Sequence, residues 1–143
     1  MANQLSITTS GGNMLCVHAA GDGPILMLVH GFPLDHTMWN AQIESLSSNY
    51  RVLAPDLRGF GASTSYGEQY SLADLADDLE HARHHLANDK SIFLCGLSMG
   101  GYVALEYWKR HGKKLAGLIL ADTKPQSDDD DAKAGREAVA QRV

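Results

Sequence analysis

Residues 91–101, SIFLCGLSMGG, pass from a short apolar run through a Gly-x-Ser-x-Gly turn into an apolar helix that begins near Tyr102. The apolar run has the composition of a buried strand. Gly96 and Gly100 flank Ser98 at places where a Cβ atom would crowd the neighbouring backbone. A strand, tight turn and helix of this kind form a nucleophile elbow, which holds one serine hydroxyl in solvent. The helix N-terminus that follows favours negative charge beside the serine.

Strands and helices alternate on both sides of this elbow. Residues 5–9 and 14–19 predict an antiparallel hairpin, and the unbroken apolar run at 25–29 predicts a strand covered on both faces. The alternation predicts an α/β fold with three layers, built on a mainly parallel sheet with an N-terminal antiparallel hairpin. The other expected elements are strands at 50–54 and 115–121 and helices at 38–46, 72–86, 102–111 and 129–143.

Local signals predict further details of these elements. Thr37 is the expected N-cap of the helix at 38–46. Ser71 and Asp74 resemble a capping box, with Asp in place of the usual Glu or Gln. The strand at 115–121 has the composition of a buried strand, but with no further strand to flank it we expect it to form an apolar edge of the sheet. The helix after Ser71 should bury one apolar stripe, made of Leu72, Leu75, Ala76, Leu79, Ala82 and Leu86.

Composition limits the classes of function. The chain has 143 residues, of which 44% are hydrophobic and 20% charged, and this is typical of one soluble globular domain. Its 12 basic and 17 acidic residues form no basic patch, so nucleic acid is not an expected partner. No secretory signal is recognisable at the start, and the longest apolar run, 25–29, is too short to span a membrane. Cys16 and Cys95 are expected to be buried and reduced, which favours a cytoplasmic location.

Two more motifs accompany the elbow in the same chain. The first is His30-Gly31-Phe32-Pro33, and the second is the glycine-punctuated loop Asp56-Leu-Arg-Gly-Phe-Gly-Ala-Ser63. Together with residues 96–101, they resemble the α/β-hydrolase family over residues 4–143, but only its N-terminal half. The resemblance divides the chain into a hydrolase core at 1–124 and the start of a cap or terminal helix at 125–143. Serine esterases and lactonases are the most similar branch, because haloalkane dehalogenases and epoxide hydrolases use aspartate at the position of Ser98.

The resemblance implies acyl transfer from a small ester-like substrate to the enzyme, without a cofactor. Ser98 would be the nucleophile for hydrolysis of a carboxylic ester, lactone or thioester. The backbone N–H groups of Met99 and Phe32 would form the oxyanion hole, since Pro33 has no N–H. Gly31 would let that backbone approach the substrate closely.

Other residues near these motifs have alternative interpretations. His36 could line the pocket, or it could be a surface loop histidine. Asp122, directly after the strand at 115–121, could be the catalytic acid or could simply end the strand. Asp56 and His30 are expected to have structural roles. His81, His84 and His85 have the spacing of metal ligands, but they share their helix face with aspartates, so we expect a solvated face and no metal site.

The expected triad is incomplete. His111 is the only histidine after Ser98, and about thirteen helical residues would place it roughly 20 Å away. The sequence therefore predicts a chain that is inactive or weakly active alone, and that forms a homodimer or associates with a chain carrying a C-terminal half. The alternative is a non-catalytic half-domain that binds a small molecule or assembles with a partner. A nucleotide-binding fold is disfavoured because neither Gly-x-Gly-x-x-Gly nor a phosphate loop is present.

Overall fold

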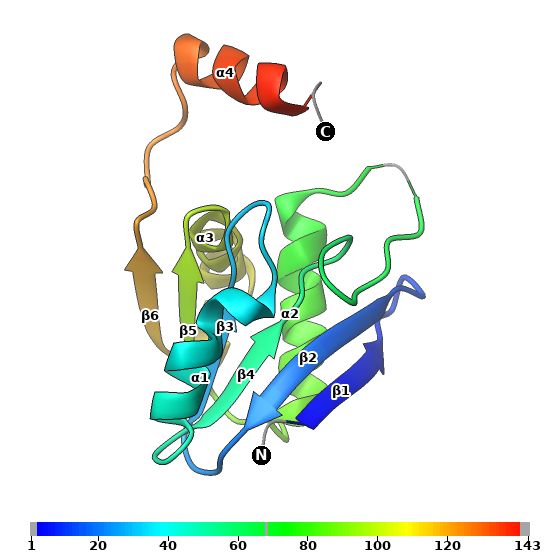
Figure 1. Ribbon diagram of the computed structural model, residues 1–143, viewed down its shortest axis with the longest axis vertical. Coiled ribbons are helices and arrows are strands. Elements are labelled where there is room, and N and C mark those ends of the chain that lie inside the picture. The colour runs from blue at the N-terminus through cyan, green and yellow to red at the C-terminus, as the bar shows by residue number, and fades with distance from the viewer. Residues whose placement is uncertain (1–2, 68, 141–143) are drawn as a thin grey trace.

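A computed structural model describes residues 3–67 and 69–140. Within them, six strands form one sheet in the order β1-β2-β4-β3-β5-β6 (Figure 1). The strand β2 pairs antiparallel with both β1 and β4, and the pairs among β4, β3, β5 and β6 are parallel. The predicted fold class is confirmed. The strands are β1 (Asn3–Thr8), β2 (Met14–Ala20), β3 (Ile25–Val29), β4 (Arg51–Pro55), β5 (Ile92–Leu97) and β6 (Leu115–Ala121).

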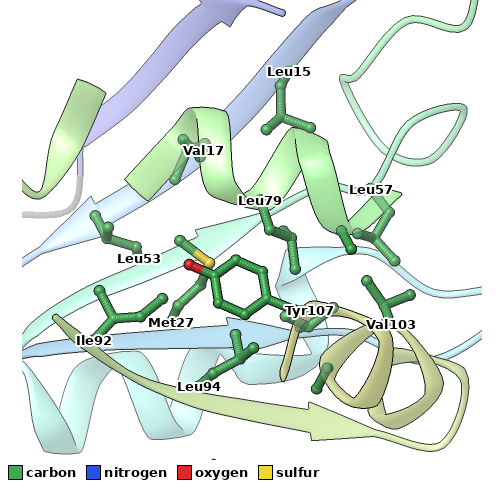
Figure 2. Close-up of a cluster of buried hydrophobic side chains, with 14 of the residues drawn as sticks. Leu15, Val17, Met27, Leu53, Leu57, Leu79, Ile92, Leu94, Val103 and Tyr107 are labelled. Carbon is green, nitrogen blue, oxygen red and sulfur yellow. The ribbon is translucent and has the colours of Figure 1, made fainter. Parts of the chain in front are cut away.

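Helices cover both faces of this sheet and complete three layers. On one face, α2 (Leu72–Leu86) and α3 (Met99–His111) pack over the larger cluster of buried side chains, which includes Tyr107 (Figure 2). On the other face, α1 (Asn40–Leu46) and the 3₁₀ turn before it bury Trp39 and Ile43 against the sheet. Between the two layers all five residues of β3 are buried, as the apolar run predicts.

One end of the sheet collects the loops that matter for function. Parallel strands bring their carboxyl ends to the same edge, so the segments after β3, β4, β5 and β6 meet there. The helix α4 (Asp130–Ala140) lies beyond this edge, apart from the sheet (Figure 1). It carries Asp130 and Asp131 in its first turn, as predicted. Residues 141–143, where the predicted helix was to continue, lie outside the described residues.

Two predicted details of the helices are wrong. The segment at 38–46 begins as a 3₁₀ turn, His36–Trp39, and becomes α-helical only at Asn40. Its cap is Asp35, whose carboxylate accepts hydrogen bonds from the Thr37 N–H at 2.8 Å and the Thr37 hydroxyl at 2.5 Å. Asp35 caps the turn in place of Thr37 because an ionised carboxylate is a stronger hydrogen-bond acceptor than a hydroxyl. In α2, Leu72 is 42% exposed, since the first turn of the helix extends beyond the packed layer.

The strand β6 forms the predicted edge of the sheet, and it is not buried as its composition alone suggests. None of its seven residues is fully buried, and Ile119 and Leu120 are 49% and 40% exposed. The strand pairs with β5 on one side, and among the described residues no strand pairs with its other side. An apolar sequence alone cannot distinguish a central strand from an edge strand, because both have the same composition.

The helix α2 is anchored at both ends. Its N-terminus has the predicted capping box. The Ser71 N–H donates to the Asp74 carboxylate, and the Asp74 N–H donates to the Ser71 hydroxyl oxygen. Near its C-terminus the buried Arg83 donates two hydrogen bonds to Glu80, at 2.7 and 2.8 Å. The Tyr107 hydroxyl of α3 donates a third hydrogen bond to Glu80, at 2.6 Å. These contacts join α2 to α3 behind the sheet.

We expect Glu80→Gln to weaken the fold and to reduce its sensitivity to acid. Partial burial raises the pKa of Glu80, but the hydrogen bonds from Arg83 and Tyr107 outweigh it and hold the pKa below the ordinary value. A lowered pKa stabilises the fold above the unfolded-state value of about 4.3, and this contribution is lost as the pH falls through the folded-state pKa. Glu80→Gln should cost about 1–2 kcal/mol at pH 7.

Urea denaturation from pH 7 to pH 3 measures this effect. The difference between Glu80→Gln and the unmodified chain should shrink as the pH falls through the acidic range. The exposed Glu44 provides the control, and Glu44→Gln should leave the curve unchanged. Parallel pH curves for the unmodified chain and Glu80→Gln would contradict the assignment.

Candidate active site

Ser98 lies at the turn between β5 and α3 in a strained backbone conformation. Its φ is 52° and its ψ is −114°, in a region that non-glycine residues rarely occupy. Such strain costs on the order of 1–3 kcal/mol and persists only where the surroundings impose it. The residue is exposed, whereas Gly96 and Gly100 on either side of it are buried. The prediction that the elbow holds Ser98 in a strained, solvent-exposed backbone conformation is confirmed.

The flanking glycines are required by close backbone contacts. A Cβ atom on Gly96 would collide with the Gly100 carbonyl oxygen. A Cβ atom on Gly100 would collide with the Val29 carbonyl oxygen and lie 2.6 Å from that of His30. Because these neighbours are backbone atoms, they cannot move aside as a flexible side chain can. The turn can therefore form only with glycine at both positions.

Hydrogen bonds from the next strand hold the elbow in place. The Ser98 N–H donates to the Ala121 carbonyl at 3.0 Å, and the Thr123 hydroxyl donates to the Ser98 carbonyl at 2.9 Å. Asp122 lies between these two partners, exposed and with a φ of 43°. The structure thus places the candidate acid at the same edge of the sheet as Ser98, between the two residues that hold the elbow.

The loop after β3 lies directly against the elbow. A Cβ atom on Gly31 would lie 3.4 Å from the Ser98 Cβ and 3.3 Å from the Leu97 carbonyl oxygen. Phe32 follows and is 48% exposed. Among the hydrogen bonds of the described residues, neither the Phe32 N–H nor the Met99 N–H has an acceptor. The two predicted oxyanion donors therefore belong to adjacent segments, with their N–H groups available.

The His30 side chain holds the loop after β3 in place through two hydrogen bonds. Its ring is fully buried, its Nε2 accepts a hydrogen bond from the Leu57 N–H at 2.9 Å, and its Nδ1 lies 3.0 Å from the Gly31 carbonyl oxygen. Since Nε2 is an acceptor, Nδ1 carries the proton and donates to Gly31. Burial lowers the pKa of His30, which keeps the ring neutral. The expected structural role of His30 is thus supported by its contacts.

His36 is held at Asp56. Both its backbone N–H and its Nδ1 contact Asp56 Oδ1, at 2.8 and 2.7 Å, and the Ala62 N–H donates to Asp56 Oδ2 at 2.9 Å. The His36 ring also stacks on His18 of β2, with ring centroids 3.4 Å apart. Asp56 is fully buried and ties the loop after β3 to the loop after β4, consistent with the structural role expected for it. Sequence reasoning did not find His18, although its place two residues after Cys16 on one strand face was a usable signal.

No histidine in the described residues hydrogen-bonds to the Ser98 hydroxyl. His111 lies at the far end of α3, thirteen residues long, where it contacts Asp77 at 2.8 Å. The other rings also have partners elsewhere: His81 with Thr8, His84 with Asp89, His85 packed against His81, and His18, His30 and His36 as described above. Within the described residues, these contacts leave no histidine in the position of a base for Ser98.

A protein-family model described as alpha/beta hydrolase fold matches residues 24–143. The chain belongs to this family. Among curated proteins, it is 37% identical to the AB hydrolase superfamily protein YisY of Bacillus subtilis over 108 residues, which cover 74% of this chain and 40% of that protein. It is 36% identical to the pimeloyl-[acyl-carrier protein] methyl ester esterase of Aeromonas hydrophila over 110 residues, 76% of this chain and 41% of that enzyme.

Solved structures extend the similarity over nearly the whole chain. A thermophilic esterase from Thermogutta terrifontis superposes with a TM-score of 0.90 and 46% identity, covering 99% of this chain and 53% of the esterase. Among the curated proteins, epoxide hydrolase 3 of Xenopus tropicalis is also similar, with 35% identity over 71% of this chain and 29% of that protein. Overall similarity therefore does not separate esterases from epoxide hydrolases. The chain spans about half or less of the length of each of these relatives.

Among residues 3–67 and 69–140, no helix combines the length and the apolar character that crossing a bilayer requires.

Proposed function

We propose that this chain is the nucleophile-bearing half of a serine hydrolase that cleaves carboxylic esters, lactones or thioesters. The observation that carries the proposal is the exposed Ser98, held at φ 52° between β5 and the N-terminus of α3. Strain of this kind is maintained at functional sites because it aims a reacting group. The similarity to an esterase and to a methyl ester esterase supports the ester class of substrate.

The proposed reaction begins with attack of Ser98 Oγ on the carbonyl carbon of the substrate. A bond forms between that oxygen and carbon, and the carbonyl electron pair moves onto the carbonyl oxygen. The N–H groups of Met99 and Phe32 would stabilise this oxyanion, each contributing about 3 kcal/mol to lowering the barrier. Collapse of the intermediate would expel the alcohol or thiol and leave an acyl-Ser98 ester, which water then hydrolyses.

The proton of Ser98 needs a base, and we propose that a segment corresponding to the other half of the fold supplies it. Asp122 is the acid that this chain itself offers, placed after β6 beside the elbow. The esterase structure is nearly twice as long as this chain, which leaves room for a histidine loop in such a segment. The two free, buried cysteines support a reducing, cytoplasmic setting for the protein.

A second candidate function has a specific observation in its favour. Within the described residues, the Ser98 hydroxyl has no histidine partner, as expected if the chain is a non-catalytic half-domain that binds a small molecule or assembles with a partner. In that case Ser98 would retain the elbow geometry without chemical reactivity.

Labelling with a fluorophosphonate probe tests the two candidates. We expect the purified chain to be labelled slowly, because the oxyanion donors and binding alone can still give about 10³–10⁴-fold acceleration over water. Labelling should disappear in Ser98→Ala and persist in the control Ser127→Ala, which changes an exposed serine of the segment before α4. Labelling that is independent of Ser98, or none above a denatured control, would favour the half-domain. Fast stoichiometric labelling would support Ser98 as the nucleophile but contradict the proposed need for a base from elsewhere.

A further inference from the structure

A cluster of potential metal ligands lies on the α1 side of the sheet. Cys16 and His18 are alternate residues of β2 and so face the same side. Asp56 follows β4 and lies opposite Cys16, with its N–H donating to the Cys16 carbonyl at 2.9 Å. One sulfur, one ring nitrogen and one carboxylate oxygen from these three residues all lie within 4.8 Å of one another.

This spacing is close to the geometry of a tetrahedral zinc site. Zinc bonds to sulfur, nitrogen and oxygen of about 2.0–2.3 Å place neighbouring ligand atoms about 3.5 Å apart. Closing the difference would require side-chain rotations of Cys16 and His18. Cys16 and Asp56 are fully buried, whereas His18 is partly exposed and leaves an approach from solvent.

The carboxylate is already oriented by an outer set of donors. The His36 N–H and ring bond to Asp56 Oδ1, and the Ala62 N–H bonds to Oδ2. Metal-binding carboxylates are commonly held by such outer hydrogen bonds. His36 itself is excluded as a ligand beside His18, because the two rings stack with an angle of 8° and their in-plane lone pairs cannot meet at one ion.

A second trio, Asp35, His36 and Asp56, has similar spacing but is less suitable. Asp35 Oδ1 already accepts the N–H and hydroxyl of Thr37 at the start of the 3₁₀ turn. His36 Nδ1 already contacts Asp56. Binding an ion there would require breaking the cap of the turn, whereas binding at Cys16 and His18 leaves that cap in place.

We propose that Cys16, His18 and Asp56 bind one divalent transition-metal ion of the zinc class, with the fourth position open to water. The thiolate and imidazole select such an ion over magnesium or calcium. On binding, a metal–sulfur bond forms and the Cys16 thiol proton is released to solvent, with no change of oxidation state. The site joins β2 to the loop after β4, and it is independent of the hydrolytic function proposed above.

Titration of the reduced, purified chain with Co²⁺ tests the proposal, because cobalt bound to a thiolate shows a charge-transfer absorption in the near ultraviolet. We expect one equivalent of Co²⁺ to produce this absorption and Zn²⁺ to abolish it by displacement. Cys16→Ser should remove it. The other cysteine provides a matched control, since Cys95 is also free and buried, and Cys95→Ser should keep the absorption.

Two histidine variants keep the test valid if Cys16→Ser misfolds or if Co²⁺ binds at another place in the chain. His18→Asn alters a partly exposed side chain and should lower the affinity for Co²⁺ at least tenfold, with an unchanged circular dichroism spectrum. His81→Asn, on the histidine-rich face of α2, should leave the affinity unchanged. Absence of the absorption in the unmodified chain, or its persistence in Cys16→Ser, would overturn the proposal. An affinity unaffected by His18→Asn would do the same.

Discussion

Replacing Gly100 with alanine is expected to destabilise the fold by about 3 kcal/mol or more, the upper range for overpacking a buried site. The new Cβ would collide with the Val29 carbonyl oxygen and lie 2.6 Å from that of His30, both at the end of a fully buried strand. Relief requires α3 to move away from β3. That movement would also displace Met99 from the loop carrying Gly31 and Phe32. The same substitution should therefore weaken both the fold and the site.

Urea denaturation, with the slope checked against the unmodified chain, measures the loss of stability. Gly135→Ala is the matched control, because Gly135 lies in α4 and a Cβ there meets no atom within 4 Å. This control should change stability by less than about 1 kcal/mol, the gain in helix propensity from Gly to Ala. Fluorophosphonate labelling of Gly100→Ala, at a urea concentration where it remains folded, should fall below that of Gly135→Ala. Equal midpoints for the two variants would contradict the packing argument.

The features that sequence predicted correctly depend on local patterns. The elbow at 96–101 combines a turn that needs glycine with an apolar strand before it and an apolar helix after it. The three neighbouring parts together identify the motif more specifically than any one of them alone. The parallel core follows from the alternation of strands and helices, which few topologies accommodate. The capping box at Ser71 and Asp74 requires only residues three apart, so it too could be recognised without tertiary information.

The features that sequence missed depend on contacts between distant segments. Asp35 and Thr37 are both good caps, and only the path of the chain after β3 decides between them. The cluster of Cys16, His18 and Asp56 exists because β2 and β4 pair in one register, in which Val17 lies opposite Pro55. The closeness of His36 to Phe32 in sequence suggests a pocket residue, whereas the His36 ring contacts Asp56, twenty positions later. Such pairings become visible only when the register of the sheet is known.

The exposed edge of β6 leads to the last prediction, which concerns assembly. The strand has the sequence LAGLILA, with neither charge nor proline to discourage pairing with another chain. Ile119 and Leu120 are 49% and 40% exposed, and in the described residues the outer side of β6 is unpaired. We expect the chain to associate at micromolar concentration, with a second copy when it is purified alone, or with a chain that carries the other half of the fold when one is present.

A lysine on this edge should prevent the association. Leu120→Lys places a charge beside any strand that pairs there, and across a symmetric contact the two charges would repel, so the dissociation constant should rise at least tenfold, or about 1.4 kcal/mol. Leu34→Lys is the matched control, since Leu34 is 46% exposed but lies in the loop after β3. Sedimentation velocity should find the unmodified chain and Leu34→Lys heavier than a monomer, and Leu120→Lys monomeric. An unmodified chain that sediments as a monomer and melts cooperatively would contradict this prediction, because the exposed edge of β6 would then be stable in solution without a partner.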